Sequence, residues 1–558
     1  MNIKSLIKKD IYDAFAGEVL LDDIVVEQPK VKSMADYSIP CFVFAKKFHK
    51  SPMDIANDLS SKLNKKNYKS VEVVAGYLNV FLSDELVNFK LKRMNDDSKF
   101  DLESVSMPET YFLDYGGPNV AKPLHVGHMR TAIVGESVKR IIEFVGHKTI
   151  SDVHLGDYGL QIGEVIYAMI RDGVSVDDLD INYLDKTYPE MNAICKENEE
   201  IKEECALIIK KLQDNDPLYI PYFRKIREVS IADIKKNYDY LDVHFDLWLG
   251  ESDSQESLIK SEELLNSKGL LKSSEGALIV DVSSDEDKKE VPPLLFKKSN
   301  GGYLYASTDV ATIYDRVRDY NPDHILYVVD NRQEMHFTQV FRTVDKAGLI
   351  DKSKLEFLGY GTVNGTDGKP YKTRNGDAPK LFDLFNQASE VFISKREENK
   401  NMSKSDVDKI VNSILKFADL SNSRDKDYIF DLAKFSDVTG KTGPYILYTY
   451  LRINKIIKNC NINDFSDIIY NEADRDLRLK LIEFDNAINL AFNERRPHYI
   501  AEYLYDLCVL ANVFYQKNRI ADLDDENKKN DWIYVLNLTN KVINQLLDLL
   551  VIDIPTVM

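Results

Sequence analysis

The chain has 558 residues, of which 44% are apolar and 29% charged, a composition that is ordinary for a globular protein of several domains. No stretch is apolar for long enough to span a membrane, and the N-terminus has no apolar core followed by a small-residue cleavage site, so we expect a cytoplasmic protein. The formal net charge of −18 taken alone disfavours a nucleic-acid partner, although a local basic face is compatible with it. The five cysteines form no Cys-x-x-Cys pair, which argues against a structural zinc site and a disulfide framework and favours buried free thiols.

The first hundred residues predict a small domain of mixed helix and strand. Residues 1–20 carry apolar side chains at helical spacing and predict an amphipathic helix whose apolar side extends to Leu20. Residues 71–83 have the pattern of a strand, a turn and a strand. The polar residues 96–109 indicate a linker, so we assign residues 1–105 to this domain.

From Thr110 onward, apolar runs with the pattern of strands alternate with helical stretches. The first run, residues 111–115, is followed by a loop and then by a helix that stops near Gly146. Such alternation is typical of an α/β fold with a parallel, Rossmann-like sheet, which we expect over residues 106–385. Further strand-like runs lie at residues 149–153, 277–282, 324–329 and 355–360.

Two other parts of the chain have a mainly helical pattern. Residues from about 165 to 275 are charged and indicate a helical insertion within the α/β unit. From about Leu381 the pattern is helical almost to the end. We divide this last part into a helical connection, residues 386–435, and an all-helical domain, residues 436–558.

The stretch GGPNVAKPLHVGHMRTA, residues 116–132, lies between the first strand and the helix that follows it. Open α/β folds bind ligands at this end of the sheet, and a helix N-terminus offers free N–H groups to phosphates. His125 and His128 can donate hydrogen bonds to phosphate oxygens. Gly127 leaves room for a nucleotide, and Lys122 adds a point charge. The alternative is a helix N-terminus that two histidines merely cap.

A second candidate phosphate site is the loop DGKPYKTRNG, residues 367–376. Two turn signals enclose Lys369, Lys372 and Arg374, which can clamp a polyphosphate. The alternative is a solvated basic loop, and for an isolated segment that would be the better interpretation.

Polar side chains also gather near the ends of other predicted strands. The Gly-rich turn HLGDYGLQIG holds His154, Asp157 and Gln161, and the segment YASTD ends in Asp309. Several polar clusters on one sheet are harder to explain as loop decoration than a single cluster. The segment VVDNRQEMH adds Asp330, Asn331, Gln333 and His336.

PNVAKPLHVGH together with HLGDYGLQIG resembles the class I aminoacyl-tRNA synthetases, and specifically the arginyl-tRNA synthetase family. Residues 125–128 are similar to the family's His-Ile-Gly-His signature, with Val in place of Ile. DYSIPCFVFAKKFHKSPMDIA resembles the family's N-terminal additional domain, which contacts the tRNA elbow, and TGPYILYTYLRI resembles its helical C-terminal part, which reads the anticodon. The resemblance implies an arginine–tRNA ligase that uses L-arginine, ATP with Mg²⁺ and tRNA(Arg), and that acts as a monomer without a membrane.

The second signature of the class is Lys-Met-Ser-Lys-Ser, and the chain contains NMSKS at residues 401–405. A helical pattern follows it directly, so we expect Ser403 or Ser405 to cap that helix instead. In arginyl enzymes the signature is often degenerate, and the resemblance identifies it with Lys-Pro-Tyr-Lys-Thr at residues 369–373.

The resemblance implies roles for the lysines and histidines at the two ends of ATP. It assigns Lys369 and Lys372 to the pyrophosphate end, with Lys122 assisting, and His125 and His128 complete the catalytic set. The ATP-binding residues that it implies are Pro118, His125, Gly127, His128, His336 and Lys372.

A guanidinium prefers planar carboxylates in bidentate contact. The match to the family's acidic residue before the signature Asn and to its Tyr-x-x-x-Asp segment implies that Asp114 and Asp309 hold the guanidinium of arginine, with Tyr305 beside it. The chain departs from the family twice, because the first acid is commonly Glu and because STD replaces a commoner Thr-Arg-Asp. The rest of the implied arginine site is Asn119 and Gln333, which hold the amino and carboxylate end, and His154.

Aromatic and basic residues in GPYILYTYLRI and FYQKNRI are candidate tRNA contacts, because aromatic rings stack on splayed bases and arginine binds phosphates or base edges. Tyrosines at this spacing on a helix are more often packing residues, and that remains the alternative. The candidates are Tyr445, Tyr448, Arg452 and Arg519.

Three other functions stay open. A nucleotidylyltransferase also uses His-x-Gly-His, but it is usually much smaller. A class I synthetase for glutamine or cysteine is a nearer alternative, although cysteine enzymes normally carry a zinc site that the scattered thiols do not supply. The third is a catalytically silent tRNA-binding paralogue, against which the intact histidines and lysines argue. Whether arginine activation requires tRNA, as is usual in the family, also stays open.

Overall fold

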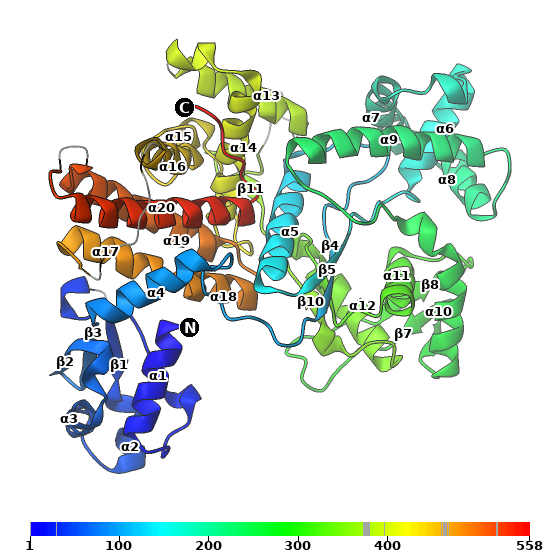
Figure 1. The fold of residues 1–558 in the computed structure, drawn as a ribbon. Coiled ribbons are helices and arrows are strands. Elements are labelled where there is room, and N and C mark those ends of the chain that lie inside the picture. The colour runs from blue at the N-terminus through cyan, green and yellow to red at the C-terminus, as the bar shows by residue number, and fades with distance from the viewer. Residues whose placement is uncertain are drawn as a thin grey trace.

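Figure 1 shows the fold in a computed structural model that describes residues 2–29, 31–371, 380–395, 397–458, 460, 466, 468–520 and 523–558. An N-terminal unit, drawn in blue, lies against a large group of C-terminal helices, drawn in orange to red. The parallel sheet lies on the other side of helix α5 (Val126–Val145) from the C-terminal helix α20 (Glu526–Leu549). The sheet and several C-terminal helices therefore meet around α5, while the N-terminal unit packs through α4 (Asp84–Asp96) on the C-terminal helices α17 (Glu472–Leu481) and α20.

The N-terminal unit is a three-stranded antiparallel sheet in the order β1-β3-β2, covered by helices. The predicted strand, turn and strand are confirmed as β2 (Tyr68–Val74) and β3 (Tyr77–Leu82), beside β1 (Tyr37–Pro40). The prediction of a helix that extends to Leu20 is wrong, because the chain turns at Gly17 with φ of 78° and Leu20 is 68% exposed. The helices of this unit are α1 (Ile3–Ala14), α2 (Ala45–Phe48), α3 (Pro52–Lys62) and α4 (Asp84–Asp96).

The central sheet has four parallel strands in the order β10-β9-β4-β5, which confirms the predicted α/β fold with a parallel sheet. Asp114, the last residue of the inner strand β4, lies level with Asp152 on β5 and with Tyr327 on β9. The strands are β4 (Thr110–Asp114), β5 (Lys148–Asp152), β9 (His324–Tyr327) and β10 (Leu355–Phe357), and two of the helices beside them are α11 (Tyr305–Tyr320) and α12 (Glu334–Lys346).

The prediction that residues 277–282 belong to the parallel sheet is wrong. Residues Ala277–Val280 form β7, the middle strand of a separate antiparallel sheet with β6 (Leu271–Ser274) and β8 (Leu294–Lys297). The two residues between β6 and β7, Glu275 and Gly276, have φ of 49° and 80°, as in the tight turns that join antiparallel neighbours. This hairpin pairs β7 with its neighbour in the sequence.

A group of helices leaves the central sheet after β5 and returns to it. The return is marked by parallel bridges from Leu247 to Asp152 and from Gly250 to Leu155. Residues 247–250 therefore extend the sheet edge at the carboxyl end of β5. The helices are α6 (Leu160–Asp172), α7 (Ile181–Glu197), α8 (Glu199–Gln213) and α9 (Ile220–Tyr240), and α10 (Gln255–Ser267) follows the return.

The C-terminal part is helical as predicted, apart from β12 (Tyr428–Ile429), which pairs in parallel with β11 (Val363–Asn364). Ser403 accepts a hydrogen bond from the backbone N–H of Asp406 at 3.1 Å, so the NMSKS segment caps a helix, as predicted. The helices are α13 (Leu381–Ser394), α14 (Lys404–Leu420), α15 (Leu432–Phe435), α16 (Gly443–Ile457), α17 (Glu472–Leu481), α18 (Phe484–Glu494), α19 (His498–Lys517) and α20.

Four of the five cysteines are buried free thiols, as predicted, but Cys460 is partly exposed. The Sγ atoms of Cys195 and Cys205 lie 3.9 Å apart between α7 and α8. Over the ranges that the structure describes, no helix combines the length and apolar character needed to cross a membrane.

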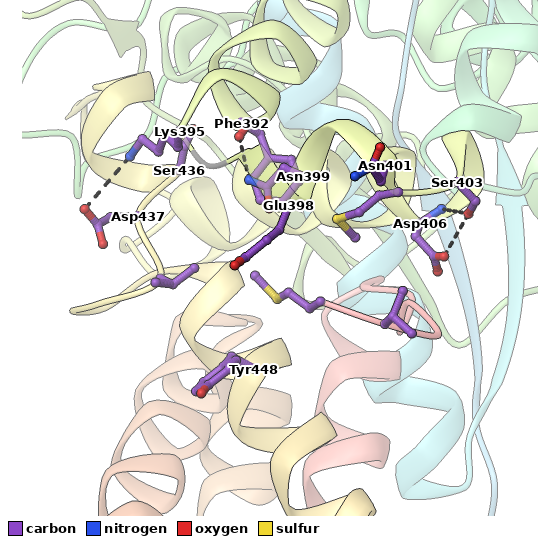
Figure 2. Close-up of a pocket in the computed structure, with 14 residues that line it drawn as sticks. Phe392, Lys395, Glu398, Asn399, Asn401, Ser403, Asp406, Ser436, Asp437 and Tyr448 are labelled. Atoms are coloured by element: carbon purple, nitrogen blue, oxygen red, sulfur yellow. Dashed lines mark hydrogen bonds and ion pairs between the residues drawn. The ribbon is translucent and has the colours of Figure 1, made fainter.

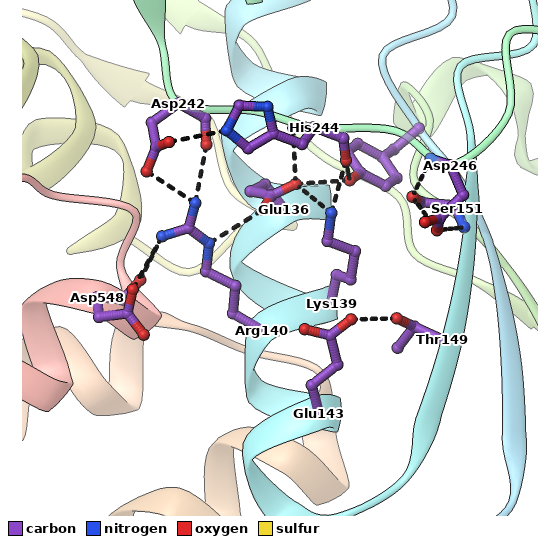
Figure 3. A network of polar contacts seen from close by, with 11 residues as sticks. Glu136, Lys139, Arg140, Glu143, Thr149, Ser151, Asp242, His244, Asp246 and Asp548 are labelled. Atoms are coloured by element: carbon purple, nitrogen blue, oxygen red, sulfur yellow. Dashed lines mark hydrogen bonds and ion pairs between the residues drawn. The ribbon is translucent and has the colours of Figure 1, made fainter. Parts of the chain in front are cut away.

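Polar contacts join the C-terminal half of α5 to distant parts of the chain, as Figure 3 shows. Arg140 contacts Glu136 on its own helix at 3.0 Å, Asp242 after α9 at 2.8 Å and Asp548 in α20 at 3.1 Å. Lys139 donates to the backbone carbonyl of His244 at 2.6 Å. These contacts fix the C-terminal half of α5, so the N-terminus of the helix has a fixed position at the end of the sheet.

Candidate functional site

Helix α5 begins at the HVGH segment, and the two histidines cap it reciprocally. Nδ1 of His125 accepts a hydrogen bond from the backbone N–H of Gly127, and Nδ1 of His128 accepts one from the N–H of His125, both at 3.1 Å. The centroids of the two rings are 4.0 Å apart. These are the contacts that the capping alternative predicts, and they also determine which atoms remain free for a ligand.

The free atom on each ring is Nε2. A ring nitrogen that accepts a hydrogen bond carries no proton, so the proton of a neutral ring is on the other nitrogen. Burial lowers the pKa of His125, and burial together with the neighbouring His125 and Lys122 lowers the pKa of His128 to about 3. Near pH 7 the histidine pair therefore offers two neutral N–H donors beside a helix N-terminus, which itself favours anions.

The loop before α5 pairs with the Gly-rich turn after β5. The N–H of Val120 donates to the carbonyl of Gly156, and the N–H of Gly156 donates to the carbonyl of Pro118, both at 3.0 Å. A Cβ at position 156 would lie 2.4 Å from Oδ1 of Asn119. The fold thus brings the two Gly-rich motifs of the sequence together, with Pro118 and Asn119 at their junction.

Lys122 lies on the same loop and faces the helices α6 and α7. Its ammonium is 5.0 Å from the centroid of the Tyr188 ring on α7. Glu164 on α6 is buried, which raises its pKa, and the charge of Lys122 opposes that shift. The lysine is partly buried, so its charge is incompletely screened by water.

The carboxylates at the ends of β4 and β5 share a buried arginine that the sequence interpretation missed. Nη2 of Arg316 on α11 lies 2.6 Å from Oδ2 of Asp114 and 3.0 Å from Oδ2 of Asp152. The guanidinium carbon lies 4.6 Å from the centroid of the Phe112 ring. Asp114, which was expected to hold a substrate guanidinium, is therefore already paired through one oxygen with a guanidinium of the chain itself.

His154 lies next to this pair, in a backbone conformation with φ of 40°. Its Nδ1 is 3.5 Å from Oδ2 of Asp152, and both ring nitrogens are buried without a hydrogen-bond partner. Burial opposes a charge on the ring, but its contact with Asp152 and the charge of Asp114 raise the pKa of His154 to about 9. The ring is therefore charged near pH 7, and its positive charge partly neutralises the carboxylates of Asp114 and Asp152.

Asp309, Tyr305 and His336 form a second group, contributed by α11 and α12. Nε2 of His336 lies 2.5 Å from Oδ2 of Asp309, and its ring centroid is 4.8 Å from that of Tyr305. His336, which was expected to contact ATP, thus lies beside Asp309 and Tyr305, which were expected to bind arginine. Oε1 of Gln333 is buried without a hydrogen-bond partner, so this amide has an acceptor available for a ligand.

A further carboxylate, Glu251, was missed because it falls within the expected helical insertion. Its backbone N–H donates to the carbonyl of Leu155 at 3.0 Å, which fixes it at the edge of the sheet. Burial raises its pKa to about 7, and the nearby carboxylates of Asp157 and Asp309 act in the same direction, against His154.

These contacts define the charge of the site. Four carboxylates face one arginine and two histidines, and Glu251 makes no ion pair among the described residues. The site therefore has an excess of negative charge. It suits a cationic ligand, because carboxylates removed from water are stabilised by cations. The carboxylates are Asp114, Asp152, Asp309 and Glu251.

The lysine loop, residues 365–371, is a hairpin attached to β11. The N–H of Gly365 donates to the carbonyl of Lys369 at 2.7 Å, and the N–H of Tyr371 donates to that of Val363 at 2.9 Å. The side chain of Lys369 is exposed, and residue 380 returns to form a bridge with His125. The predicted site residue Lys372, like Arg374, lies outside the described residues.

An exposed cluster of two tyrosines and an arginine lies on α16 and α19. The guanidinium of Arg452 lies 4.6 Å from the ring of Tyr448 and 5.4 Å from that of Tyr515, both partly exposed. Tyr445 accepts a hydrogen bond from Asn512 at 3.0 Å and lies partly buried against the core, as the packing alternative predicts. The remaining candidate, Arg519, is exposed beyond the end of α19.

Tyr448 also lines a cavity of about 660 Å³, which Figure 2 shows. The cavity lies between α13, α14 and α16 and includes the C-terminal residue Met558. Its lining residues lie on α13, α14, α16, the segments between them and the last two residues of the chain, and none of them is a strand residue of the central sheet.

Three family models match this chain, and together they cover most of its length. The family model described as tRNA synthetases class I (R), catalytic domain, matches residues 94–432. Models described as Arginyl tRNA synthetase N terminal domain and DALR anticodon binding domain match residues 1–82 and 446–558. The chain is therefore a member of the class I tRNA synthetases.

Individual relatives identify the family within this class. A protein of Alkaliphilus oremlandii named arginine–tRNA ligase is 40% identical, and one of Agathobacter rectalis with the same name is 39% identical, each over 92% of both chains. The structure of Plasmodium falciparum arginyl-tRNA synthetase has a TM-score of 0.82 at 26% identity and covers 100% of this chain and 98% of that one. Thermus thermophilus arginyl-tRNA synthetase shares the fold, with a TM-score of 0.85 at 21% identity over 100% of both chains. Within its class, the chain belongs to the arginyl-tRNA synthetase family, which confirms the resemblance of its motifs.

The protonation of the histidine pair is directly testable. We expect His128 not to titrate between pH 5 and 8, since burial and neighbouring charges lower its pKa to about 3, and we expect its proton on Nε2. Nitrogen chemical shifts of ¹⁵N-histidine-labelled protein measure both properties, with His128→Asn for assignment. A proton on Nδ1, or titration near pH 6.5, would contradict the capping geometry.

Proposed function

We propose that this chain joins arginine to tRNA(Arg) at the expense of ATP, using the site at the carboxyl end of the parallel sheet. The single observation that carries the proposal is the excess of carboxylates at the buried Asp114 and Asp309 and the half-buried Glu251, next to a capped helix N-terminus. The carboxylates suit a guanidinium, and the helix N-terminus suits phosphates. Lysine would fit this site less well, because an ammonium cannot engage two carboxylates in fork geometry.

The first step needs no protein nucleophile. The carboxylate of arginine attacks the α-phosphate of ATP, the bond to the β-phosphate breaks, and arginyl-adenylate and pyrophosphate form. Nε2–H of His125 and of His128 donate to the phosphates as charge builds on them. Lys122 and, at the pyrophosphate end, Lys369 and Lys372 add positive charge. Asn119 and the unpartnered Oε1 of Gln333 hold the amino and carboxylate end of arginine.

Mg²⁺ accompanies ATP in this proposal. Among the described residues, no three His, Cys, Asp or Glu side chains are grouped so that they could hold a metal ion. On nucleotides, Mg²⁺ is usually held by the phosphates and by water, with one or two carboxylates. When bound, the ion neutralises phosphate charge, while the histidines and lysines orient the phosphates.

In the second step the terminal ribose hydroxyl of tRNA attacks the carbonyl carbon of the adenylate, and AMP leaves. We assign the tRNA elbow to the N-terminal domain, residues 1–105, and the anticodon to the all-helical domain, residues 436–558. The catalytic domain is residues 106–385, with residues 386–435 as the connection. The chain is proposed to act as a monomer, which its mass in solution tests.

The test is ATP–pyrophosphate exchange with each amino acid in turn, with and without total tRNA. We expect exchange with arginine, and Asp309→Asn should raise the KM for arginine strongly. Asp319→Asn, an exposed acid on the same helix α11, is the matched control and should exchange as the unmodified protein does. Exchange with another amino acid would refute the arginine site, and no exchange under any condition would favour the silent tRNA-binding paralogue.

Arginine binding should release protons near pH 7.5. Asp114, which together with Asp152 raises the pKa of His154 to about 9 in the free protein, pairs with the incoming guanidinium, and the added positive charge favours loss of the proton from His154. The same positive charge favours ionisation of the fraction of Glu251, with a pKa of about 7, that is still protonated. Affinity for arginine should therefore rise with pH from 6 to 9.

Titration calorimetry in buffers of different ionisation enthalpy, with tRNA present, counts the protons. We expect release of roughly one proton, reduced in His154→Gln, because the amide does not titrate in this range. Proton uptake, or an affinity for arginine that falls as pH rises, would show that His154 does not face the guanidinium.

The exposed cluster on α16 and α19 should contribute to tRNA binding. Removing one stacking ring costs about 1–3 kcal/mol per base, so Tyr448→Ala or Tyr515→Ala should lower kcat/KM for tRNA by roughly 5- to 150-fold. Exchange at saturating tRNA should change little. Tyr499→Ala, a tyrosine at the other end of α19, is the control, and equal effects of all three variants would refute a stacking role.

A further inference from the structure

Arg130 lies one turn into α5, two residues beyond His128, and is 1% exposed. Its Nη1 donates to the backbone carbonyls of Gly361 at 2.6 Å and Thr362 at 3.3 Å. Its Nη2 donates to the carbonyls of Arg424 and Lys426, both at 3.1 Å. A single buried side chain thus binds four carbonyls from two segments that are about sixty residues apart in the sequence.

The charge of this guanidinium is balanced within the protein. Nε of Arg130 lies 3.4 Å from Oδ1 of Asp419 on α14, and the ring of Tyr428 lies 5.0 Å from the guanidinium carbon. Lysine cannot replace these contacts, because it is a point charge with no planar fork of donors. The arrangement therefore depends on the shape of the guanidinium and not only on its charge.

The two segments that Arg130 binds form the base of the lysine loop. Residues 361–362 lead directly into β11, and the N–H of Gly361 donates to the carbonyl of Arg424 at 2.9 Å. β12 then pairs with β11, and the N–H of Tyr371, at the end of the loop, donates to Val363 of β11. The backbones approach so closely that a Cβ at position 361 would lie 2.4 Å from the carbonyl carbon of Lys426.

We propose that Arg130 is a positioning residue that holds the lysine loop, residues 365–371, at a fixed place relative to the histidine pair of α5. The inference rests on the proposed function, in which these two groups act on the same ATP molecule. The same turn of α5 presents His128 to the phosphates and binds the base of the loop that carries Lys369. Two rigid elements, a helix and a strand pair, thereby set the separation of the cationic groups, which is what electrostatic catalysis requires.

The test compares Arg130→Lys with Lys139→Met in the exchange reaction. Lys139 is the matched control, because it is another largely buried cation of α5 that binds a backbone carbonyl, but on the segment after α9. For Arg130→Lys we expect kcat/KM for ATP to fall on the order of 100-fold, since small displacements of catalytic groups have effects of this size. The KM for arginine should stay unchanged. Equal losses toward ATP and arginine, or the same pattern in Lys139→Met at matched thermal stability, would overturn the proposal.

A second readout does not depend on activity. Hydrogen exchange of the amides of Gly365 and Tyr371 should be faster in Arg130→Lys than in the unmodified protein, and unchanged in Lys139→Met. Unchanged protection in Arg130→Lys would overturn the proposal. If the unmodified protein shows no arginine-dependent ATP–pyrophosphate exchange, the proposed function fails. The hydrogen exchange of the amides of Gly365 and Tyr371 still decides the role of Arg130.

Should Arg130→Lys fail to fold, Gly361→Ala provides the same test from the opposite side. Its added Cβ separates residue 361 from residue 426 and leaves Arg130 intact. We expect the same loss toward ATP and the same faster amide exchange. A Gly361→Ala protein with normal kinetics toward ATP would overturn the proposal.

Discussion

A buried helix can carry charged side chains only if each of them finds a partner inside the protein, because an unpaired buried charge is very costly. Helix α5 carries Arg130, Glu136, Lys139 and Arg140 on its covered sides. Their partners come from the base of the lysine loop, the segment after α9 and the end of α20. The requirement to pair these charges therefore gathers distant parts of the chain around the helix that begins at the histidine pair.

The same requirement shapes the ends of β4 and β5, where we propose that arginine binds. Arg316 neutralises only part of the charge of Asp114 and Asp152, and His154 is protonated to supply more. The free protein thus keeps its carboxylates stable with a guanidinium and an imidazolium of its own. A ligand cation enters a site whose charge is partly compensated beforehand, so selectivity depends on the shape of the cation as well as its sign.

The residues that a sequence can identify are those whose function is encoded in a continuous segment. Asn119, His125 and Gly127 lie in one short segment of the sequence. The start of a helix at His125, the missing side chain of Gly127 and the polar group of Asn119 can all be predicted from that segment. Arg316 and Glu251 could not be found in this way, because their significance arises only when α11 and residues 247–251 fold against the ends of β4 and β5. The strand β7 was assigned to the wrong sheet for a related reason, since its apolar pattern does not specify its neighbours.

The contact between Gly156 and Asn119 limits how this site can be altered. The two residues belong to different motifs, but the amide of one occupies the space that a side chain of the other would fill. An engineer who randomises the turn after β5 in order to admit a different amino acid will displace Asn119 with nearly every substitution at position 156. Libraries for this scaffold should therefore keep the glycine constant and vary α11 and α12 instead, which carry Asp309, Tyr305 and His336 of the proposed amino-acid site.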